Sequence, residues 1–414
     1  MKICYAHDGL SLYDHRFIDF LLRSGDEVHL VTFSKEFPSS SISRRLVAQA
    51  RSHKYNCFHT HHISIGDLSL GKIGRGIQLV CRAMALSILV RKIRPDLLIG
   101  CTATTYGFYA ALSHFSPFVL MIWGSDVMTQ PKESPIVKRV VRFSVQKSDI
   151  AVVDGEAARD ALLSLQLSAK FIKFPWSVDL EKFNVRSRRA DSMTLRNRLG
   201  WVHNPIVICT RLHEPIYGIE SLIRAIPHVI EKNPDVRFLI VGSGSLTEDL
   251  KELVHQLTLH EYVKFTGEIE HDEIPSYYAA CDVYVSPSFS DGTSGALLEA
   301  MASNLPVIVT NTPGNHEWVE DGVNGMFFRS GDSRALADVL LRVLSCRYLS
   351  RLLAENARET VEKKADIRKN LALFRSYLLA LREAYGKRKH LSIKQKGRGP
   401  LPQHWDKRHQ LGPS

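Results

Sequence analysis

The chain has 414 residues, of which 44% are hydrophobic and 23% are charged, and its formal net charge is +11. This composition excludes a largely disordered chain and is typical of an ordinary globular protein, while the length predicts two domains of roughly 150 to 200 residues. The 7 cysteines are scattered without a Cys-x-x-Cys pair, which favours reduced thiols over a disulfide framework or a zinc site.

The N-terminus, MKICYAHDG, has no basic region followed by a long apolar stretch and a cleavage site. We therefore expect no export signal and a cytoplasmic location. The positive charge is concentrated at two places: residues 1–180 contain 22 Lys and Arg against 15 Asp and Glu, and residues 386–414 contain 8 against 1.

The first half alternates apolar, strand-like runs with amphipathic, helix-like stretches. Helical patterns cover 16–23, 76–92 and 136–147. The strand-like runs are KICYA (2–6), EVHLVTF (27–33), DLLIG (96–100), FVLMIW (118–123) and DIAVV (149–153). Strands separated by helices predict a parallel sheet that is covered on both faces.

A polar, basic stretch at 184–204 interrupts this alternation, which then restarts. The strand-like runs of the second half lie at 205–210, 236–242, 262–267, 282–287 and 305–310, and a helical stretch covers about 349–385. We expect two doubly wound, Rossmann-like α/β domains facing a central cleft, with ligands bound at the carboxyl ends of the strands. The predicted boundaries are a first domain at 1–183, a linker at 184–204, a second domain at 205–365, a helix at 366–385 that returns to the first domain, and a disordered basic tail at 386–414.

The stretch SDGTSGALLEAM, residues 290–301, joins a glycine-containing loop to a helix. Free backbone N–H groups at a helix N-terminus favour an anion such as a diphosphate. Asp291 and Glu299 lie eight residues apart, up to about 12 Å along a helix axis, which is beyond the roughly 5 to 9.5 Å of glycosidase carboxylate pairs. The spacing instead suits one elongated ligand, a nucleotide diphosphate-sugar, although a solvated loop Asp and a helix Glu with a local role explain it equally well.

Two further features are open to more than one interpretation. FHTHHIS places His59, His61 and His62 in a strand-like run, but no carboxylate or cysteine accompanies them at ligand spacing, so we expect no metal site. The basic amphipathic segment at 71–94, with Ile73, Ile77, Val80, Met84, Ile88 and Val90 among its apolar residues, fits either a helix with a solvated basic face or one that contacts an anionic membrane.

Several motifs together resemble the family-four retaining glycosyltransferases. SDGTSGALLEAMASNLPVIVT (290–310) is similar to the Glu-x7-Glu segment of that family. The other similar segments are CTRLHEPIYGIESLIRAI (209–226), FLIVGSGSLTEDL (238–250), PGNHEWVEDGVNGMFF (313–328), WGSDV (123–127) and WSVDLEKF (176–183). The resemblance covers about residues 1–385 and is specific through the combination of motifs.

The resemblance implies a GT-B fold and metal-independent transfer, with retention, from a nucleotide sugar whose nucleotide is UDP or GDP. No other cofactor and no metal ion are implied. The first domain would bind the acceptor and the second the donor, with Arg211 on the diphosphate, Asp291 beside the sugar and Glu299 on the ribose. The remaining implied donor-binding residues are Tyr217, Gly218, Gly242, Ser243, Gly244, Ile269, Gly292, Thr293, Ser294 and Gly295.

This chain departs from the family pattern at three positions. Tyr217 stands where members often have Lys and could offer a phosphate only a hydroxyl hydrogen bond. Asp291 replaces the first Glu, and Trp123 stands where a catalytic-region His is common. Asp126 is then a candidate catalytic group, and Gly9, His15 and Trp123 are the candidates on the acceptor side.

We interpret the sequence as a glycosyltransferase, moving a hexosyl or N-acetylhexosaminyl group to a glycan or lipid-linked acceptor in surface polysaccharide or glycolipid assembly. Its expected partners are the nucleotide-sugar donor, this acceptor and an anionic membrane surface, and no nucleic acid. Two alternatives remain open: a nucleotide-sugar epimerase or glycan phosphorylase on the same fold, and a non-catalytic scaffold that binds polyanions or membranes.

Overall fold

A computed structural model of the chain describes residues 1–8, 12–33, 57–64, 71–128, 130–165, 170–175, 177–185 and 189–392. Gly9 and residues 393–414 of the expected basic tail lie outside these ranges. The chain forms two compact units: unit 1 comprises Met1–Pro175 and Lys369–Ser414, and unit 2 comprises Trp176–Arg368.

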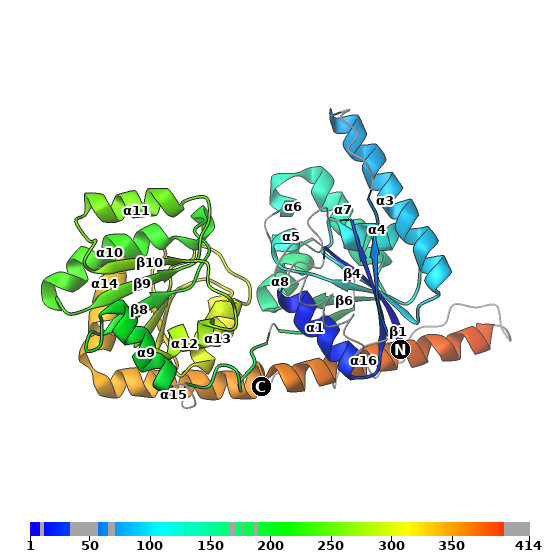
Figure 1. Ribbon diagram of the computed structural model, residues 1–414. Helices are drawn as coiled ribbons and strands as arrows, with labels where there is room; N and C mark the ends of the chain where they lie inside the picture. Colours follow the sequence, from blue (N-terminus) through cyan, green and yellow to red (C-terminus); the bar gives the residue numbers. More distant parts are fainter. Residues whose placement is uncertain are drawn as a thin grey trace. The chain divides into compact units, whose positions relative to one another are not determined.

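Unit 1 is built on a seven-stranded parallel sheet with the strand order β3-β2-β1-β4-β5-β6-β7 (Figure 1). The strands are β1 (Lys2–Ala6), β2 (Glu27–Thr32), β3 (Phe58–His62), β4 (Leu97–Cys101), β5 (Phe118–Met121), β6 (Ile150–Val153) and β7 (Phe171–Lys173). Strands such as β4 and β5 are buried along their whole length. This explains why they are continuous apolar runs without an alternating polar face.

Helices cover both faces of the unit 1 sheet. The core on one face includes residues of α3 (Gly71–Ile93), α4 (Tyr106–Leu112), α7 (Pro135–Lys147) and α8 (Glu156–Ser164). The short helices α5 (Ser125–Met128) and α6 (Gln130–Glu133) follow β5. Phe17 of α1 (Leu12–Arg23) packs against Phe374 of α16 (Ile367–Ser392), with ring centroids 5.3 Å apart.

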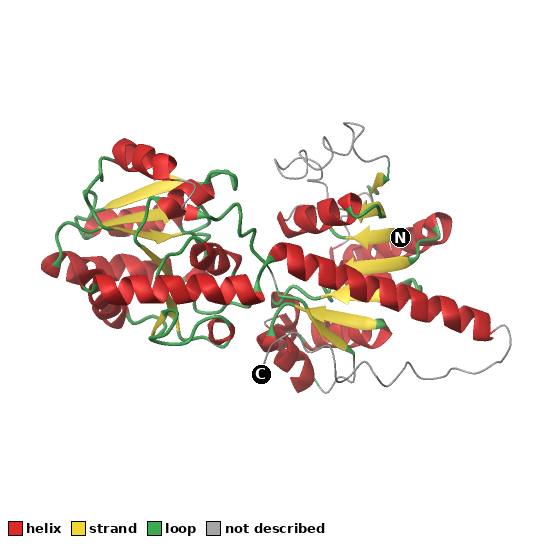
Figure 2. Ribbon diagram, turned by 90° about the horizontal axis from the view of Figure 1, so that it is seen from below, coloured by secondary structure: helices red, strands yellow, loops and turns green. Residues whose placement is uncertain are grey.

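Helix α16 is tied to unit 1 by charge as well as by packing. Arg375 donates to Asp26 at 2.6 Å, Arg382 lies 3.1 Å from Asp96, and Tyr385 donates to Asp149. The segment runs beside the sheet in Figures 1 and 2. It remains helical to Ser392, so residues 386–392, which we expected to belong to a disordered tail, continue the helix.

Unit 2 has a six-stranded parallel sheet with the order β10-β9-β8-β11-β12-β13. The strands are β8 (Ile206–Cys209), β9 (Arg237–Val241), β10 (Val263–Gly267), β11 (Val283–Ser286), β12 (Val307–Thr310) and β13 (Met326–Phe328). Together the two sheets confirm the predicted fold class, two Rossmann-like α/β domains.

The helices of unit 2 form a layer on each face of its sheet. One layer contains α9 (Arg189–Leu199), α12 (Ile274–Ala279) and α13 (Gly295–Ala302), and the other contains α10 (Ile219–Lys232), α11 (Thr247–Gln256) and α14 (Ser333–Ser345). Helix α15 (Arg347–Lys364) contributes to both, and the one-turn helices are η3 (Pro215–Tyr217) and η4 (Asn315–Glu317). The stretch 184–204, expected as a linker, contains α9, whose Leu195 joins the core.

Candidate functional site

The carboxyl edge of the unit 2 sheet has a point where the strand order reverses. The chain passes from β8 to β9 and β10 on one side, and then returns to place β11 on the other side of β8. Loops that leave neighbouring strands in opposite directions open a crevice for a ligand at such a switch point. Arg211 follows β8 and Asp291 follows β11, so the switch point brings these two candidates together.

Arg211 is held by two partners from the loop after β11. One terminal nitrogen donates to Asp291 Oδ2 at 2.7 Å and the other to Ser294 Oγ at 2.5 Å. The side chains of Arg211 and Asp291 are only 8% and 13% exposed, so this is a nearly buried ion pair. The Nε of Arg211 is buried and forms no hydrogen bond within the described part of the chain.

Burial and charge act in opposite directions on this pair. Burial alone would lower the pKa of Arg211, but the Asp291 carboxylate raises it, so Arg211 stays charged. Burial raises the pKa of Asp291, and the guanidinium opposes that rise. In this state Asp291 therefore neutralises the positive charge of Arg211.

Tyr217 contributes its ring to the site. The Arg211 guanidinium carbon lies 4.3 Å from the centre of that ring, a cation–π contact. The residue ends the one-turn helix η3, and Gly218 follows with φ +59°. We expected Tyr217 to act through its hydroxyl, whereas the observed contact places its ring face on the cation.

Gly242 and Gly244 bring the loop after β9 against the loop after β8. A Cβ at Gly242 would lie 2.7 Å from the carbonyl oxygen of Arg211, and one at Gly244 would lie 2.5 Å from that of His213. Gly242 also has φ +121°, which side chains disfavour. Between them Ser243 donates to Glu268 at 2.7 Å, and its carbonyl accepts from the N–H of His213. The two glycines thus allow the loop after β9 to approach the backbone of Arg211 and His213 closely.

The loop of Gly292, Thr293 and Ser294 leads into α13, which begins at Gly295. Ser294 caps the helix, because its Oγ accepts from the N–H of Leu297 at 3.3 Å. Thr293 accepts from the Trp318 indole at 3.4 Å. Gly314, which the sequence did not single out, lies so close that a Cβ there would be 2.1 Å from the carbonyl oxygen of Asp291.

Glu299 lies on α13, the helix that Ser294 caps. Its Oε1 is 2.8 Å from Nε2 of His271, and Nδ1 of His271 is 2.7 Å from Nζ of Lys182. Ile269, just before His271, packs half-buried against the same core as α13. The carboxylate that the resemblance assigns to ribose is therefore held in position by a histidine and, behind it, a lysine.

Asp126, the third catalytic candidate, is bound by backbone groups of unit 1. Its Oδ2 accepts from the N–H of Ala103 at 2.6 Å and its Oδ1 from that of Trp123 at 3.2 Å. Burial raises the pKa of Asp126 to about 6. This geometry fixes the loops after β4 and β5. His15 lies half-buried on α1.

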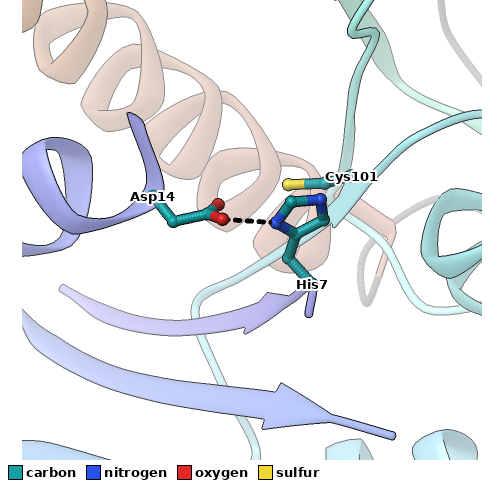
Figure 3. A group of neighbouring side chains, drawn as sticks. All are labelled: His7, Asp14 and Cys101. Carbon is teal, nitrogen blue, oxygen red and sulfur yellow. Dashed lines mark hydrogen bonds and ion pairs between the residues drawn. The ribbon is translucent and has the colours of Figure 1, made fainter. Parts of the chain in front are cut away.

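A buried histidine network lies at the end of β1 (Figure 3). His7 Nδ1 is 2.6 Å from Asp14 Oδ2, and Tyr5 donates to the other oxygen of Asp14 at 2.6 Å. The Trp123 indole stacks on the His7 ring, with centroids 4.8 Å apart, and Cys101 lies beside them. Burial alone would lower the pKa of His7, but the charge and hydrogen bond of Asp14 raise it overall.

The orientation of His7 leaves one ring nitrogen for other partners. When Nδ1–H donates to Asp14, the neutral ring carries its lone pair on Nε2. No hydrogen bond of Nε2 is seen among residues 1–8, 12–33 and the other described ranges. His7 and Asp14 were missed from the sequence, as was His271. The usable signal was position, since His7 directly follows the first apolar strand and His271 closely follows β10.

Helix α3 has an apolar stripe on its exposed side. Ile77, Val80, Met84 and Ile88 are 42%, 53%, 59% and 64% exposed. Val90, which we grouped with them, is instead buried in the core, and the side chain of Ile73 is outside the described set. In the described ranges, no helix combines the length and apolar character needed to cross a membrane.

Comparison with known proteins shows the family of the chain. Residues 2–154 match the family described as "Glycosyl transferase 4-like", and residues 203–346 match "Glycosyl transferases group 1". A sulfoquinovosyl transferase of Arabidopsis thaliana is 27% identical over 360 residues, covering 84% of this chain and 66% of the relative. A GDP-mannose-dependent phosphatidylinositol monomannoside mannosyltransferase of Mycobacterium tuberculosis is 26% identical over 235 residues, covering 55% of this chain and 60% of the relative.

The chain thus spans about 60 to 66% of the length of these two curated relatives. Among solved structures, HepE of Anabaena in complex with UDP has a TM-score of 0.75 at 20% identity, covering 92% of this chain and all (100%) of that one. That similarity concerns the fold. With two glycosyltransferase domains in sequence and two Rossmann-like sheets in the structure, the chain belongs to the GT4-type glycosyltransferases of the GT-B fold.

Proposed function

We propose that the chain transfers a sugar from a nucleoside diphosphate-sugar to a lipid-linked acceptor, with unit 2 binding the donor and unit 1 the acceptor. One observation carries the proposal: Arg211 lies at the switch point beside Ser294, the N-cap of α13, with its Nε buried and without a hydrogen bond among the described residues. A buried donor lacking an acceptor is costly, and a diphosphate oxygen would satisfy it.

Donor binding then requires Arg211 to change partners. The diphosphate competes with Asp291 for the guanidinium, while the ring of Tyr217 keeps the cation in place. Released from Arg211, Asp291 is placed to contact the sugar. Positive charge and the N-terminus of α13 stabilise the leaving diphosphate, so the reaction needs no metal ion. We propose retention as a separate point, with the acceptor hydroxyl attacking the anomeric carbon from the face that the diphosphate leaves and its proton passing to a base or to the diphosphate. Glu299 accepts hydrogen bonds from the ribose.

On the acceptor side, we assign His7 to the reacting hydroxyl group. Asp14 holds Nδ1, so Nε2 can accept the hydrogen of an acceptor hydroxyl, and Trp123 provides an apolar face for a sugar or glycerol group. Asp126 acts as a positioning residue for the Trp123 backbone.

The exposed stripe of α3 supports a membrane-borne acceptor. Four large apolar side chains on one helix face fit insertion into the interfacial region of a bilayer, and the basic surplus of residues 1–180 suits anionic lipids. The mannosyltransferase relative is named for a phosphatidylinositol mannoside acceptor. We therefore propose peripheral association with the cytoplasmic face of a membrane, in glycolipid or surface polysaccharide assembly.

The test is transfer of radiolabel from UDP- and GDP-sugars into the organic phase of vesicles that contain diacylglycerol or phosphatidylinositol, with EDTA present. NMR of the product then reports the anomeric configuration. We expect labelled lipid from the wild type and at least a 100-fold lower rate from Arg211→Met. Arg196→Met, which removes an arginine of another ion pair in unit 2, serves as the matched control.

Three results would contradict the proposal. Equal rates for the Arg211 and Arg196 variants would contradict the assignment of Arg211 to the donor site. Activity that EDTA abolishes would contradict metal independence, and an inverted product would contradict retention. Separately, Met84→Asp should reduce sedimentation with anionic vesicles while leaving nucleotide binding unchanged.

A further inference from the structure

A second group of polar side chains lies on β2 and β3, at the edge of the unit 1 sheet that ends with β3. Register places His29 of β2 directly beside His59 of β3, and Glu27 and His61 lie two residues away along the same strands. Residues two apart in a strand share a face, so all four side chains lie on one face. The sequence places no carboxylate or cysteine at ligand spacing from the histidines of β3, and we expected no metal site; the fold brings Glu27 of β2 close to them.

The distances suit a small cation. His29 Nε2 lies 2.9 Å and His59 Nε2 3.8 Å from Glu27 Oε1, and one ligand atom from each of the three residues lies within 4.8 Å of the other two. Zinc bonds of about 2.0 to 2.1 Å in a tetrahedron separate the ligand atoms by about 3.3 Å. The two distances from Glu27 bracket this value, and the site would form by rotation of these side chains.

We propose that Glu27, His29 and His59 bind a divalent transition metal ion, with zinc as the best match to two imidazoles and a carboxylate. The site lies outside the proposed reaction and does not depend on it. His59 is 45% and Glu27 34% exposed, so an ion and a completing water molecule have access from solvent.

His61 supports this site from behind. Its Nε2 is 2.9 Å from Nδ1 of His29. When His29 Nε2 binds the ion, its proton resides on Nδ1 and donates to His61, the arrangement common for metal-bound histidines. His29 and His61 each change from the tautomer with hydrogen on Nε2 to the one with hydrogen on Nδ1, and neither ring gains or loses a proton overall.

Lys2 is the cation that now interacts with Glu27. Its Nζ lies 3.2 Å from the same Oε1, and it is 37% exposed. Because a metal ion and an ammonium group repel each other, Lys2 must turn toward solvent when the ion binds. Metal binding would join the edge strand β3 to β2 through side chains as well as through backbone hydrogen bonds.

The experiment uses the untagged full chain, freed of metal with a chelator. Zinc affinity is measured by competition with a chromophoric chelator, and the ligand set is read from the visible spectrum of added Co²⁺. We expect one site with micromolar or tighter Kd, weakened at least 100-fold in His59→Ala and Glu27→Gln and about 10- to 100-fold in His61→Ala. Lys2→Met should tighten binding.

His62→Ala is the matched control, since His62 lies on the same strand but the alternate face. It should keep the wild-type affinity. Hydrogen exchange of amides 58–62 should slow with zinc in the wild type and not in His59→Ala. Equal zinc affinity in the His59 and His62 variants, a millimolar Kd, or zinc-independent exchange in β3 would each overturn the proposal.

Discussion

Replacing Asp291 with Asn tests the central feature of the donor site, the competition for Arg211. A guanidinium and a carboxylate with charge centres about 4 Å apart attract by about 4 kcal/mol at an effective dielectric constant of 20. Both partners are nearly buried, at 8% and 13% exposure, so solvent screens this attraction little. Asn keeps the volume and one acceptor oxygen of Asp but removes the competing charge.

Two opposite effects should follow. If a third of the attraction is transferred to the diphosphate, the affinity for UDP or GDP rises about tenfold, since about 1.4 kcal/mol is a factor of ten. Without nucleotide, the buried cation loses its counter-charge, which costs about 2 kcal/mol and lowers Tm by about 4 to 8 °C in a unit of this size. We expect sugar transfer to fall as well, because Asp291 is proposed to contact the sugar.

Calorimetric titration with nucleotide and thermal unfolding measure the two effects. The control is Asp282→Asn, which removes the carboxylate of a second 2.7 Å ion pair at the amino end of β11. It should lower Tm without changing nucleotide affinity. Unchanged or weaker nucleotide binding by Asp291→Asn would refute the idea that Asp291 and the diphosphate share Arg211.

Three further changes have defined outcomes. Tyr217→Leu should weaken nucleotide binding about fivefold in titration calorimetry, because a cation–π contact is worth about 1 kcal/mol, while Tyr217→Phe should not; a loss in both would point to the hydroxyl group. Gly314→Ala should abolish nucleotide binding, since its Cβ would lie 2.1 Å from the Asp291 carbonyl oxygen, whereas Gly386→Ala, with open space around it, should bind normally. The pKa of Asp126 is raised from 3.8 to about 6, so its folded form binds the proton more tightly and the wild type should lose roughly 2 kcal/mol of unfolding free energy as pH rises from 4 to 7. Denaturant titrations should show this slope disappear in Asp126→Asn, and an equal slope in both proteins would contradict the assignment.

The sequence predicted the strands that are buried on both faces, because their apolar runs admit few alternatives. It did not predict β7 and β13, which are three residues long at sheet edges and carry too little pattern. The helical stretch expected at 349–385 is divided between Lys364 and Ile367, next to the predicted boundary at 365/366. The break lies where Val178 and Asp366 form a bridge, a contact between residues far apart in the chain that periodicity cannot reveal.

For the site, too, local patterns were predictable from the sequence and contacts between distant residues were not. Residue types at strand ends, such as Arg211 after β8, were visible in the sequence, but their partners were not. Asp291 is 80 positions from Arg211, and Glu299 is 28 positions from His271. The pairings of His7 with Asp14 and of Glu27 with His59 likewise depend on register and rotamer, which only the folded chain defines.

The return of α16 to unit 1 makes unit 2 an insertion within the chain of unit 1. A fragment covering residues 176–368 can therefore be expressed as one continuous polypeptide for nucleotide titrations. A chain truncated at residue 368 would leave unit 1 incomplete. It would lack Arg375, the partner of Asp26, and Phe374, which packs on Phe17. A shortened chain for crystallisation should accordingly keep all residues up to Ser392, the last residue of α16.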